Sequence, residues 1–433
     1  MPGPRLSSRQ TVLLPDVDPF YAAPAGLSSA KPGDILRSRP VPYPIAAFNT
    51  AVVNLKGAYQ ILYRTTDSNG QPEAAMTTLL IPYNANPAKL LSYQIAEDAA
   101  YSGCAPSFIL QKSSTPNATV SQAEIILIEA ALNNGWYVVT PDYEGPKSSY
   151  VAGIQAGQAT LDSIRAVLKS SSFSGISVKP KVALWGYSGG ALATNWAIEL
   201  QGSYAPELSF VGAAIGGLIG SIENVLETIN KGPFVGLAAT GLMGLYNEYP
   251  YFATYLEEQF IPATAETFKS VLRQCLGVST SQFSGQDIFS YFKSGAAVLD
   301  GAPAQKVFGA LNLGQNVPKM PLYIYKSIND QISPIADADN LVNYYCKGGA
   351  AVEYKRDLVS DHTSLAITGA GEALVWLEAR MSGQSPESGC STDTVISTLL
   401  NPEGLALLGT TLVECLIALL GVPVGPLSLG TLG

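Results

Sequence analysis

Short apolar runs alternate with longer amphipathic stretches over much of the chain. The runs have the length and the β-branched and aromatic content of buried strands, and the stretches between them repeat apolar residues at helical spacing. The first two runs flank Asp67-Ser68-Asn69-Gly70 and predict an antiparallel hairpin. In the first half of the chain the pattern predicts strands over 58–65, 74–81, 90–95, 136–140 and 182–185, and helices over 121–134, 156–170 and 191–200.

The helix predicted over 121–134 carries signals at both ends. Ser121 followed by Glu124 has the spacing of a capping box, in which each side chain binds the other residue's backbone amide. Gly135 suits the left-handed turn that ends many helices. We therefore expect one continuous helix between these residues.

The same alternation returns near the C-terminal end. It predicts strands over 321–325 and 351–358, the second being the last strand of the sheet, and helices over 335–345 and 364–381. Strands that alternate with helices build a mostly parallel sheet with helices on both faces, and ligands bind beyond the carboxyl ends of its strands. The predicted fold class is therefore α/β.

Between these two halves the pattern changes. Residues 221–317 form helix-like segments broken by Gly and Pro, too long for a connecting loop, and we interpret them as a cap over the site. The predicted organisation is an extended N-terminal segment (1–45), the first part of the core (46–220), the helical cap (221–317), the second part of the core (318–392), and a C-terminal helix and flap (393–433).

Composition and charge exclude several classes of function. Apolar residues make up 47% of the 433, which is ample for a large core, and charged residues only 14%. A net charge of −9 without clusters of Lys and Arg argues against nucleic acid as a partner. One histidine and five scattered cysteines give no metal-ligand spacing, so we expect neither a metal nor another cofactor.

The ends of the chain and its cysteines bear on localisation. The first twenty residues lack the apolar core of a signal peptide, while five distant cysteines and the sequon at Asn117 suit a secreted glycoprotein. We expect a secreted protein numbered without its signal peptide. The apolar stretch 405–420 is interrupted by Gly409 and Glu414, and we interpret it as a helix packed on the body instead of a membrane anchor.

Chemistry is clearest at Gly186-Tyr187-Ser188-Gly189-Gly190, between a predicted strand and a predicted helix. A serine in such a sharp turn takes a strained backbone conformation, and its neighbours must be small so that strand and helix can approach. This is the nucleophile elbow of an α/β-hydrolase, with Ser188 as the nucleophile. The pattern G-x-S-x-G alone occurs by chance in glycine-rich chains, and the flanking strand and helix make it specific.

A serine hydroxyl needs a base, and the base needs a group that orients it. His362 is the only histidine of the chain, and it follows the strand predicted over 351–358. Asp330 follows the strand over 321–325, which gives the order Ser, acid, His of α/β-hydrolases. The alternatives for the acid are Asp337 and Asp339, near a helix start, and Asp361, directly beside the imidazole in sequence.

The oxyanion that forms when a serine attacks a carbonyl group needs two hydrogen-bond donors. The backbone amide of Gly189 is one candidate, and the loop after the strand over 90–95 supplies the other. That loop reads Ala96-Glu97-Asp98 and lacks an H-G-G-G motif. Asp98 could act through its backbone amide, or through its carboxyl group if a raised pKa keeps it protonated.

Several longer motifs, in order along nearly the whole chain, resemble the fungal secretory lipases typified by Candida antarctica lipase A. They are DPFY at 18–21, the Glu97-Asp98 loop through CAPS at 104–107, VVTPDYEG at 138–145, GYSGGALAT at 186–194, SYAPEL at 203–208, GPF at 232–234, NDQI at 329–332 and DHT at 361–363. The chain departs from the type enzyme mainly in the cap and tail, which would line the substrate pocket.

The resemblance implies a site. It implies a triad of Ser188, Asp330 and His362, an oxyanion hole from Asp98 and the Gly189 amide, and a cap with a C-terminal flap over an acyl tunnel. It also implies disulfides between Cys104 and Cys275 and between Cys346 and Cys390, which leaves Cys415 free.

The expected function is a secreted serine ester hydrolase, a lipase or carboxylesterase acting on triacylglycerols or other lipophilic esters. We expect a monomer that contacts a lipid interface transiently. One alternative on the same scaffold is an acetylesterase or acyltransferase acting on a fungal secondary metabolite. The other is a binding protein without activity, which the intact Ser, Asp and His make a poor explanation.

Overall fold

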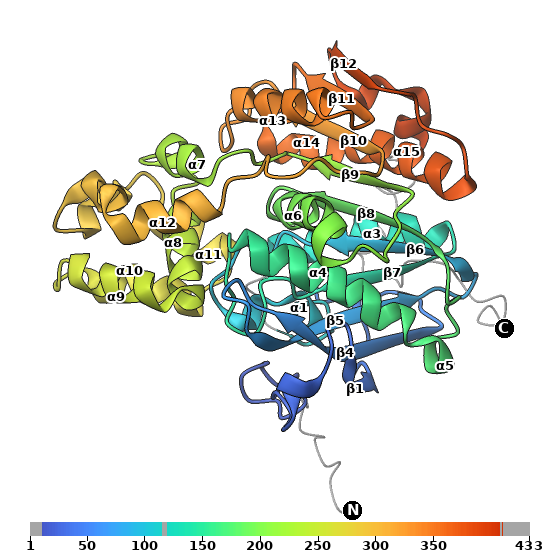
Figure 1. Ribbon diagram of the computed structural model, residues 1–433, viewed down its shortest axis with the longest axis horizontal. Coiled ribbons are helices and arrows are strands. Elements are labelled where there is room, and N and C mark those ends of the chain that lie inside the picture. Colours follow the sequence, from blue (N-terminus) through green and yellow to red (C-terminus); the bar gives the residue numbers. More distant parts are fainter. Residues whose placement is uncertain (1–10, 115–118, 408, 410–433) are drawn as a thin grey trace, which may run out of the picture.

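One large sheet organises the computed structural model, which describes residues 11–114, 119–407 and 409. Its strand order is β1-β4-β5-β7-β6-β8-β9-β10-β11-β12 (Figure 1). The first four strands in this order pair antiparallel, and the rest pair parallel. The strands are β1 (Ile35–Pro40), β4 (Gly57–Thr66), β5 (Pro72–Ile81), β6 (Asn86–Gln94), β7 (Trp136–Pro141), β8 (Lys181–Tyr187), β9 (Gly212–Gly216), β10 (Leu322–Ser327), β11 (Val352–Asp357) and β12 (Cys390–Val395).

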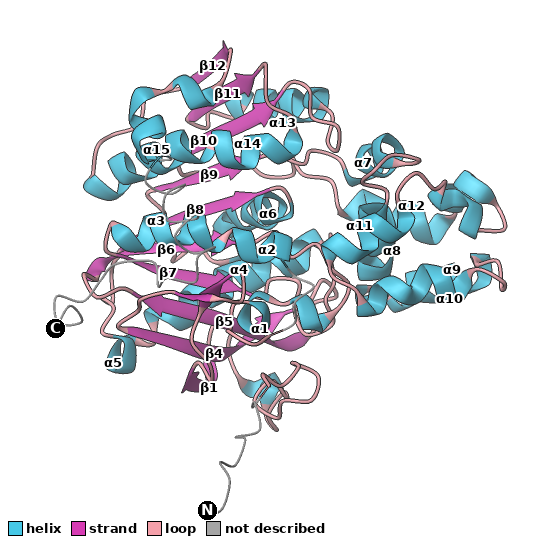
Figure 2. Cartoon of the chain, turned by 180° about the vertical axis from the view of Figure 1, so that it is seen from behind, coloured by secondary structure: helices cyan, strands magenta, loops and turns pink. Residues whose placement is uncertain are grey.

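Helices cover both faces of this sheet (Figure 2). Along β8, Val182 and Leu184 belong to the core under α4, α6 and α13, while Ala183 and Trp185 belong to the core under α3 and α15. This alternation follows from the two-residue period of a strand. The helices outside residues 221–317 are α1 (Pro106–Ile109), α2 (Thr119–Ala123), α3 (Ile125–Asn133), α4 (Gly153–Leu168), α5 (Ser171–Ser174), α6 (Gly189–Tyr204), α13 (Ile335–Lys347), α14 (His362–Thr368) and α15 (Ala370–Ser382). The predicted α/β fold with helices on both faces is confirmed.

The remaining helices gather at one end of the sheet (Figures 1 and 2). All fall within residues 221–317, which we call the cap, and a separate cluster of buried apolar residues joins them. They are α7 (Ile222–Ile229), α8 (Gly236–Glu248), α9 (Pro250–Gln259), α10 (Ala265–Lys269), α11 (Leu276–Phe283) and α12 (Ala302–Ala310). The exact domain boundaries stay a prediction.

Four details differ from the sequence analysis. Within the segment 1–45, β1 pairs with β4 as an edge strand of the sheet, a strand that the sequence analysis did not predict. The strand over 351–358 is not the last, since β12 pairs beside it. The helix over 364–381 is two helices separated at Gly369, where a Cβ would lie 2.5 Å from the Tyr325 ring. The short β9 was not predicted.

A second, small sheet pairs β2 (Ala46–Ala47) with β3 (Ala51–Val52). Most of the C-terminal helix and flap expected over 393–433 lies outside the described residues.

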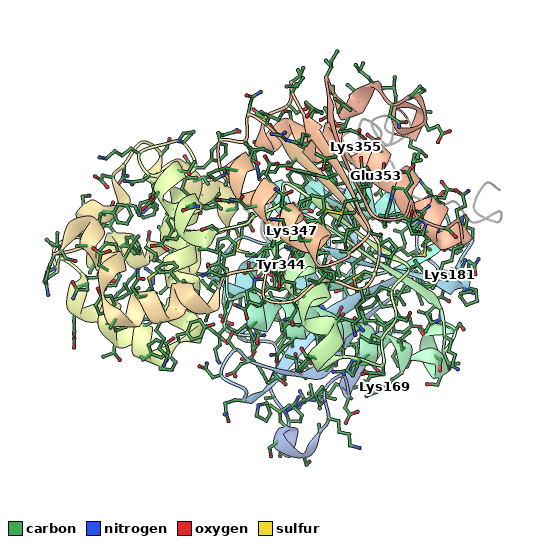
Figure 3. The ribbon with its side chains drawn as sticks, turned by 45° about the horizontal axis from the view of Figure 1, so that its top comes forward. Lys169, Lys181, Tyr344, Lys347, Glu353 and Lys355 are labelled. Atoms are coloured by element: carbon green, nitrogen blue, oxygen red, sulfur yellow. A yellow bond between two sulfur atoms is a disulfide. The ribbon has the colours of Figure 1, made fainter. Side chains whose placement is uncertain are left out.

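Surface charges on β11 are paired with each other. Lys355, for example, lies 3.4 Å from Glu353 (Figure 3).

Candidate active site

Ser188 stands alone between β8 and α6. Its backbone has φ 54° and ψ −118°, a conformation that residues other than glycine rarely adopt. A Cβ at Gly190 would lie 2.0 Å from the carbonyl oxygen of Gln94, and one at Gly186 would lie 2.2 Å from the carbonyl oxygen of Gly190. The small neighbours that the elbow pattern requires are therefore enforced by backbone contact on both sides.

His362 lies against this serine. Its Nε2 is 2.8 Å from Ser188 Oγ, and its Nδ1 is 2.6 Å from Asp330 Oδ2. The histidine begins α14, where the Tyr187 hydroxyl donates to its carbonyl and its backbone amide donates to Gln331 Oε1. The three residues predicted from chain order are thus joined in one line of hydrogen bonds.

Asp330 is surrounded by donors. Lys326 Nζ donates to Oδ2 over 2.6 Å, and the backbone amides of Ile332 and Ser333 each donate to Oδ1 over 2.8 Å. Burial by itself would raise the pKa of this carboxyl, but the hydrogen bond and charge of His362 and the cation of Lys326 hold the pKa well below its usual range. Asp330 is therefore an anion over the working pH range.

The alternative acids have other partners. Asp337 accepts from the Asn224 side chain, and Asp339 accepts from the Tyr354 hydroxyl. Asp361 caps α14 through the backbone amide of Ser364. Each of these carboxylates serves a helix or a neighbouring side chain, which leaves Asp330 as the one that braces the imidazole.

Asp98 packs against Gly189, the residue that follows Ser188. It is 3% exposed, has φ 48°, and its Oδ1 is 1.8 Å from where a Cβ of Gly189 would stand. Oδ1 has no hydrogen-bond partner among the described residues, whereas Tyr150 bonds the carboxyl group. Burial raises the pKa of Asp98 to about 7, against the lowering effect of Tyr150. Below that pH the carboxyl group carries a proton that it can donate.

The amide of Gly189 completes this side. Gly189 is the first residue of α6, and amides of a first helical turn have no partner within the helix. The helix dipole also places positive potential at that end. The carboxyl group of Asp98 and this amide thus lie together at the N-terminal end of α6, next to Ser188 in the chain.

Glu124 corrects one prediction. Its carboxylate accepts from the Tyr93 hydroxyl and from the backbone amide of Ala96, and the Ser121 hydroxyl donates to the carbonyl of Ala96. The predicted capping box is therefore wrong, because the backbone groups after β6 are enclosed and need these partners. The helix divides at Glu124 into α2 and α3.

Further buried carboxyl groups lie close enough to Asp98 for their charges to interact with it. The sequence analysis did not single them out as a group. Burial raises the pKa of Glu97 and of Glu144, and neighbouring acidic charges add to both shifts. Burial also raises the pKa of Asp142 to about 7 and that of Glu124 to about 8. The loop that carries Asp98 is thus packed among acids that favour their protonated forms.

An apolar cavity reaches Ser188 from the cap. Its walls include Val151, Ile219, Leu226, Leu242 and Ile332. Its free volume is about 20 Å³, room for about one water molecule. An acyl chain can enter this cavity only after side chains or helices of the cap move.

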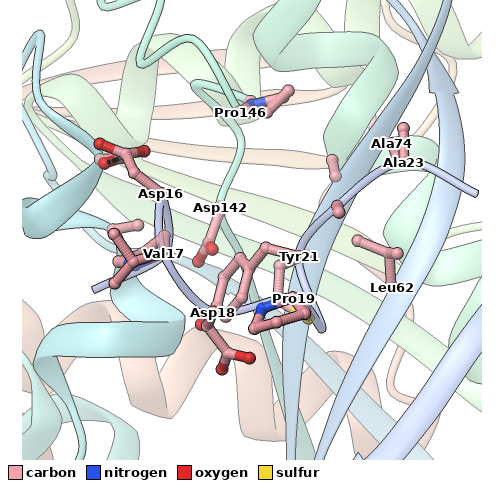
Figure 4. Close-up of a pocket in the computed structure, with 17 residues that line it drawn as sticks. Asp16, Val17, Asp18, Pro19, Tyr21, Ala23, Leu62, Ala74, Asp142 and Pro146 are labelled. Atoms are coloured by element: carbon pink, nitrogen blue, oxygen red, sulfur yellow. Dashed lines mark hydrogen bonds between the residues drawn. The ribbon is translucent and has the colours of Figure 1, made fainter. Parts of the chain in front are cut away.

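A larger cavity of about 320 Å³ lies away from Ser188, under the N-terminal segment (Figure 4). Asp16, Tyr21 and Asp142 line it. The Tyr21 hydroxyl is 2.8 Å from Ser107 Oγ, which donates to Asp142. Its polar groups bind each other, so this cavity belongs to the packing of the N-terminal segment.

Two disulfides join Cys104 to Cys275 and Cys346 to Cys390. The first links the loop after Asp98 to the start of α11 in the cap, and the second links α13 to β12. Asn117 and Cys415, for which we predict a glycosylation site and a free thiol, lie outside the described residues.

Comparison with known proteins decides the family. The Secretory lipase family matches residues 110–389. The chain belongs to this family. It is 47% identical to Lipase A of Arthroderma benhamiae over 95% of this chain and 89% of the relative, and 41% identical to Lipase 2 of Candida albicans over 94% and 90%. The crystal structure of Candida antarctica lipase A in its closed state superposes with a TM-score of 0.85, at 31% identity, over 97% of this chain and 100% of that one.

Membership makes this secretory lipase a carboxylic ester hydrolase, and the resemblance stated from the motifs is confirmed. Substrates of lipases are lipophilic esters. Within the described parts of the chain, none of the helices has the length and apolar content to cross a bilayer. The same residues hold no group of three His, Cys, Asp or Glu side chains arranged for a metal ion.

Proposed function

We propose that this secretory lipase cleaves esters through a covalent acyl-enzyme on Ser188. The observation that carries the proposal is the line of hydrogen bonds Ser188–His362–Asp330 at 2.8 and 2.6 Å. His362 Nε2 accepts the serine proton as Oγ attacks the ester carbonyl, and then gives it to the leaving alcohol. Water attacks the acyl-enzyme by the same steps and releases the acid, while Asp330 holds the imidazole in the required tautomer.

The oxyanion hole of this mechanism consists of the Gly189 amide and Asp98. A protonated Asp98 donates its O–H to the oxyanion, and the pKa of about 7 supports this in acidic and neutral media. The absence of a Cβ at Gly189 supports the same assignment, because any side chain there would displace the Asp98 carboxyl group.

The cap supplies the substrate site. The apolar walls of the cavity at Ser188 fit an acyl chain, so we propose triacylglycerols or other lipophilic esters as substrates. The protein would be secreted, act as a monomer, and contact a lipid interface transiently. A second candidate, an acetylesterase or acyltransferase acting on a secondary metabolite, is favoured by the small free volume of that cavity, because a short acyl group needs the least movement of the cap to enter.

The mechanism is tested by the variant Ser188→Ala. We expect hydrolysis of p-nitrophenyl butyrate to fall by at least about 10⁴-fold and labelling by a fluorophosphonate probe to be lost. Ser203→Ala is the matched control. It changes an exposed hydroxyl near the end of α6, and it should keep both hydrolysis and labelling. Unchanged turnover in Ser188→Ala would rule out the mechanism.

The substrate class is tested by a series of p-nitrophenyl esters from acetyl to palmitoyl. A lipase favours medium or long chains, and a maximum at acetyl would favour the second candidate. Gly241 lines the cavity, and a Cβ there would meet Val151 at 3.6 Å. Gly241→Leu should therefore lower kcat/KM for palmitoyl esters about tenfold more than for acetyl esters.

A further inference from the structure

Lys326 is a buried cation beside the site, on the strand that leads to Asp330. Its side chain and that of Asp330 are both 0% exposed, and Nζ is 2.6 Å from Oδ2. His362 Nδ1 is 2.6 Å from the same oxygen. One carboxylate oxygen therefore accepts from an ammonium group and from the imidazole at once.

This arrangement changes the electrostatics of the imidazole. A lone carboxylate stabilises the imidazolium form by charge attraction, and in a buried site that attraction is strong. A cation on the same oxygen cancels much of it.

The other charged groups nearby do not replace this effect. Asp357 at the end of β11 accepts the amides of Val359 and Ser360, and Tyr187 on β8 donates to the carbonyl of His362. Arg356 on β11 pairs with a carboxylate of α13 at 3.3 Å. The acidic groups that face Lys326 or His362 from the surrounding elements are Asp337 on α13 and Asp361 at the start of α14, and Asp357 at the end of β11 acts on the neighbouring Tyr187.

The acidic neighbours all favour a protonated imidazole, and Lys326 opposes them. Burial lowers the pKa of Lys326 below its usual value, and the charge and hydrogen bond of Asp330 offset only part of that lowering. The contact at 2.6 Å keeps the ammonium form, since a neutral amine would leave Asp330 without its nearest charge partner.

We propose that Lys326 is a positioning residue of the hydrolytic site that extends activity into acid by offsetting the charge of Asp330. This inference rests on the proposed triad. It predicts that removing the cation moves the acid limb of the pH profile toward higher pH, because the imidazole then stays protonated over a wider range.

The test compares kcat/KM for p-nitrophenyl butyrate between pH 4 and pH 8 in three variants. Lys326→Met removes the charge and keeps the length of the side chain. Lys326→Gln removes the charge and keeps a donor for Asp330. Lys326→Arg keeps the charge. Lys355→Met makes the same substitution on the neighbouring strand β11, where Lys355 binds Asp393 at the surface, and is the matched control.

We expect the acid limb to move up by about one pH unit in Lys326→Met and Lys326→Gln. Lys326→Arg and Lys355→Met should keep the position of the wild-type limb. Because His362 is the only histidine, labelling with ¹⁵N-histidine gives a single imidazole signal, and its titration should shift in the same direction. Near-UV circular dichroism shows which variants are folded.

Coincident acid limbs in the wild type and in either folded neutral variant would overturn the proposal. If neither neutral variant folds, the wild type decides, since an acid limb centred above about pH 7 would contradict an offset aspartate. Activity retained in Ser188→Ala would instead contradict the triad itself, so the two failures are distinct.

Discussion

Two buried aspartates lie near Ser188, and their surroundings favour the charged form of Asp330 and the neutral form of Asp98. Asp330 accepts hydrogen bonds from Lys326, His362 and two backbone amides, and its pKa lies below the usual range. Asp98 is bonded by Tyr150 and has one oxygen without a partner among the described residues, and its pKa is raised to about 7. Burial opposes ionisation at both sites, so the donors decide the charge.

The same type of side chain thus has two different tasks at Asp330 and at Asp98. An anion can brace an imidazole that becomes positively charged, and a neutral carboxylic acid can donate to an oxygen that becomes negatively charged. A site that needs both tasks at one pH must separate the pKa values of its acids. The experiments below test whether donors separate them here.

The largest effect is expected on the Asp330 side. Asp330→Asn keeps the size of the side chain but removes the charge and favours the wrong tautomer of His362, so kcat should fall about 10⁴-fold. The measurement is steady-state hydrolysis of p-nitrophenyl butyrate. Asp339→Asn, on the adjacent helix α13, should stay within twofold of the wild type. A loss below tenfold in Asp330→Asn would contradict the assignment of Asp330 as the anion that braces His362.

The Asp98 side should give a smaller loss and a different pH dependence. Asp98→Ala removes one donor to the oxyanion and should lower kcat about 10²- to 10³-fold. Asp98→Asn donates through its amide at every pH, so it should keep most activity below pH 7 and lack the decline that we expect of the wild type as Asp98 ionises near pH 7. A profile of Asp98→Asn that still declines there would assign the decline to another group.

Tyr150→Phe tests how a single donor affects the pKa of Asp98, because it removes the hydrogen bond that Tyr150 makes to that carboxyl group. This bond lowers the pKa of Asp98, so its loss should raise that pKa and move the basic limb of kcat/KM upward by about half a pH unit. The rate at the plateau should change less than about fivefold. Tyr137→Phe, whose hydroxyl donates to Ser174 far from the site, is the control. A downward shift would show that Tyr150 favours the neutral acid.

The smallest effect concerns stability. The pKa values of Glu73, Asp98 and Asp142 are raised to about 7 and that of Glu124 to about 8, whereas free carboxyls titrate near 4. The stability from these bound protons is complete below about pH 4 and is lost as pH rises through 7 to 8. Tm should therefore fall by about 5 °C between pH 5.5 and pH 8.5. A rising Tm by scanning calorimetry would contradict these shifts.

The sequence predicted features that depend on local signals. The elbow, its flanking strand and helix, and the places of Asp330 and His362 after strands could be found because residue type and chain order carry them. The missed strands lack such signals, since β9 is built from small residues and β12 from polar ones at the edge of the sheet. Tertiary pairing alone makes them strands.

Polar side chains were predicted less well, because their partners are distant in sequence. Glu124 matched a capping box, yet its carboxylate serves the backbone after β6. Lys326, at the end of an apolar run, gave no signal of its burial against Asp330. A local pattern shows which groups can bind, and the fold decides which of them meet.

The bond between Cys104 and Cys275 restricts how this lipase can admit a substrate. It is a covalent tether between the loop that carries Asp98, six residues before Cys104, and the cap. The cap cannot swing away as a rigid lid without pulling on that loop and disturbing the donors to the oxyanion. Any movement of the cap that spares this loop would have to be confined to cap segments away from Cys275.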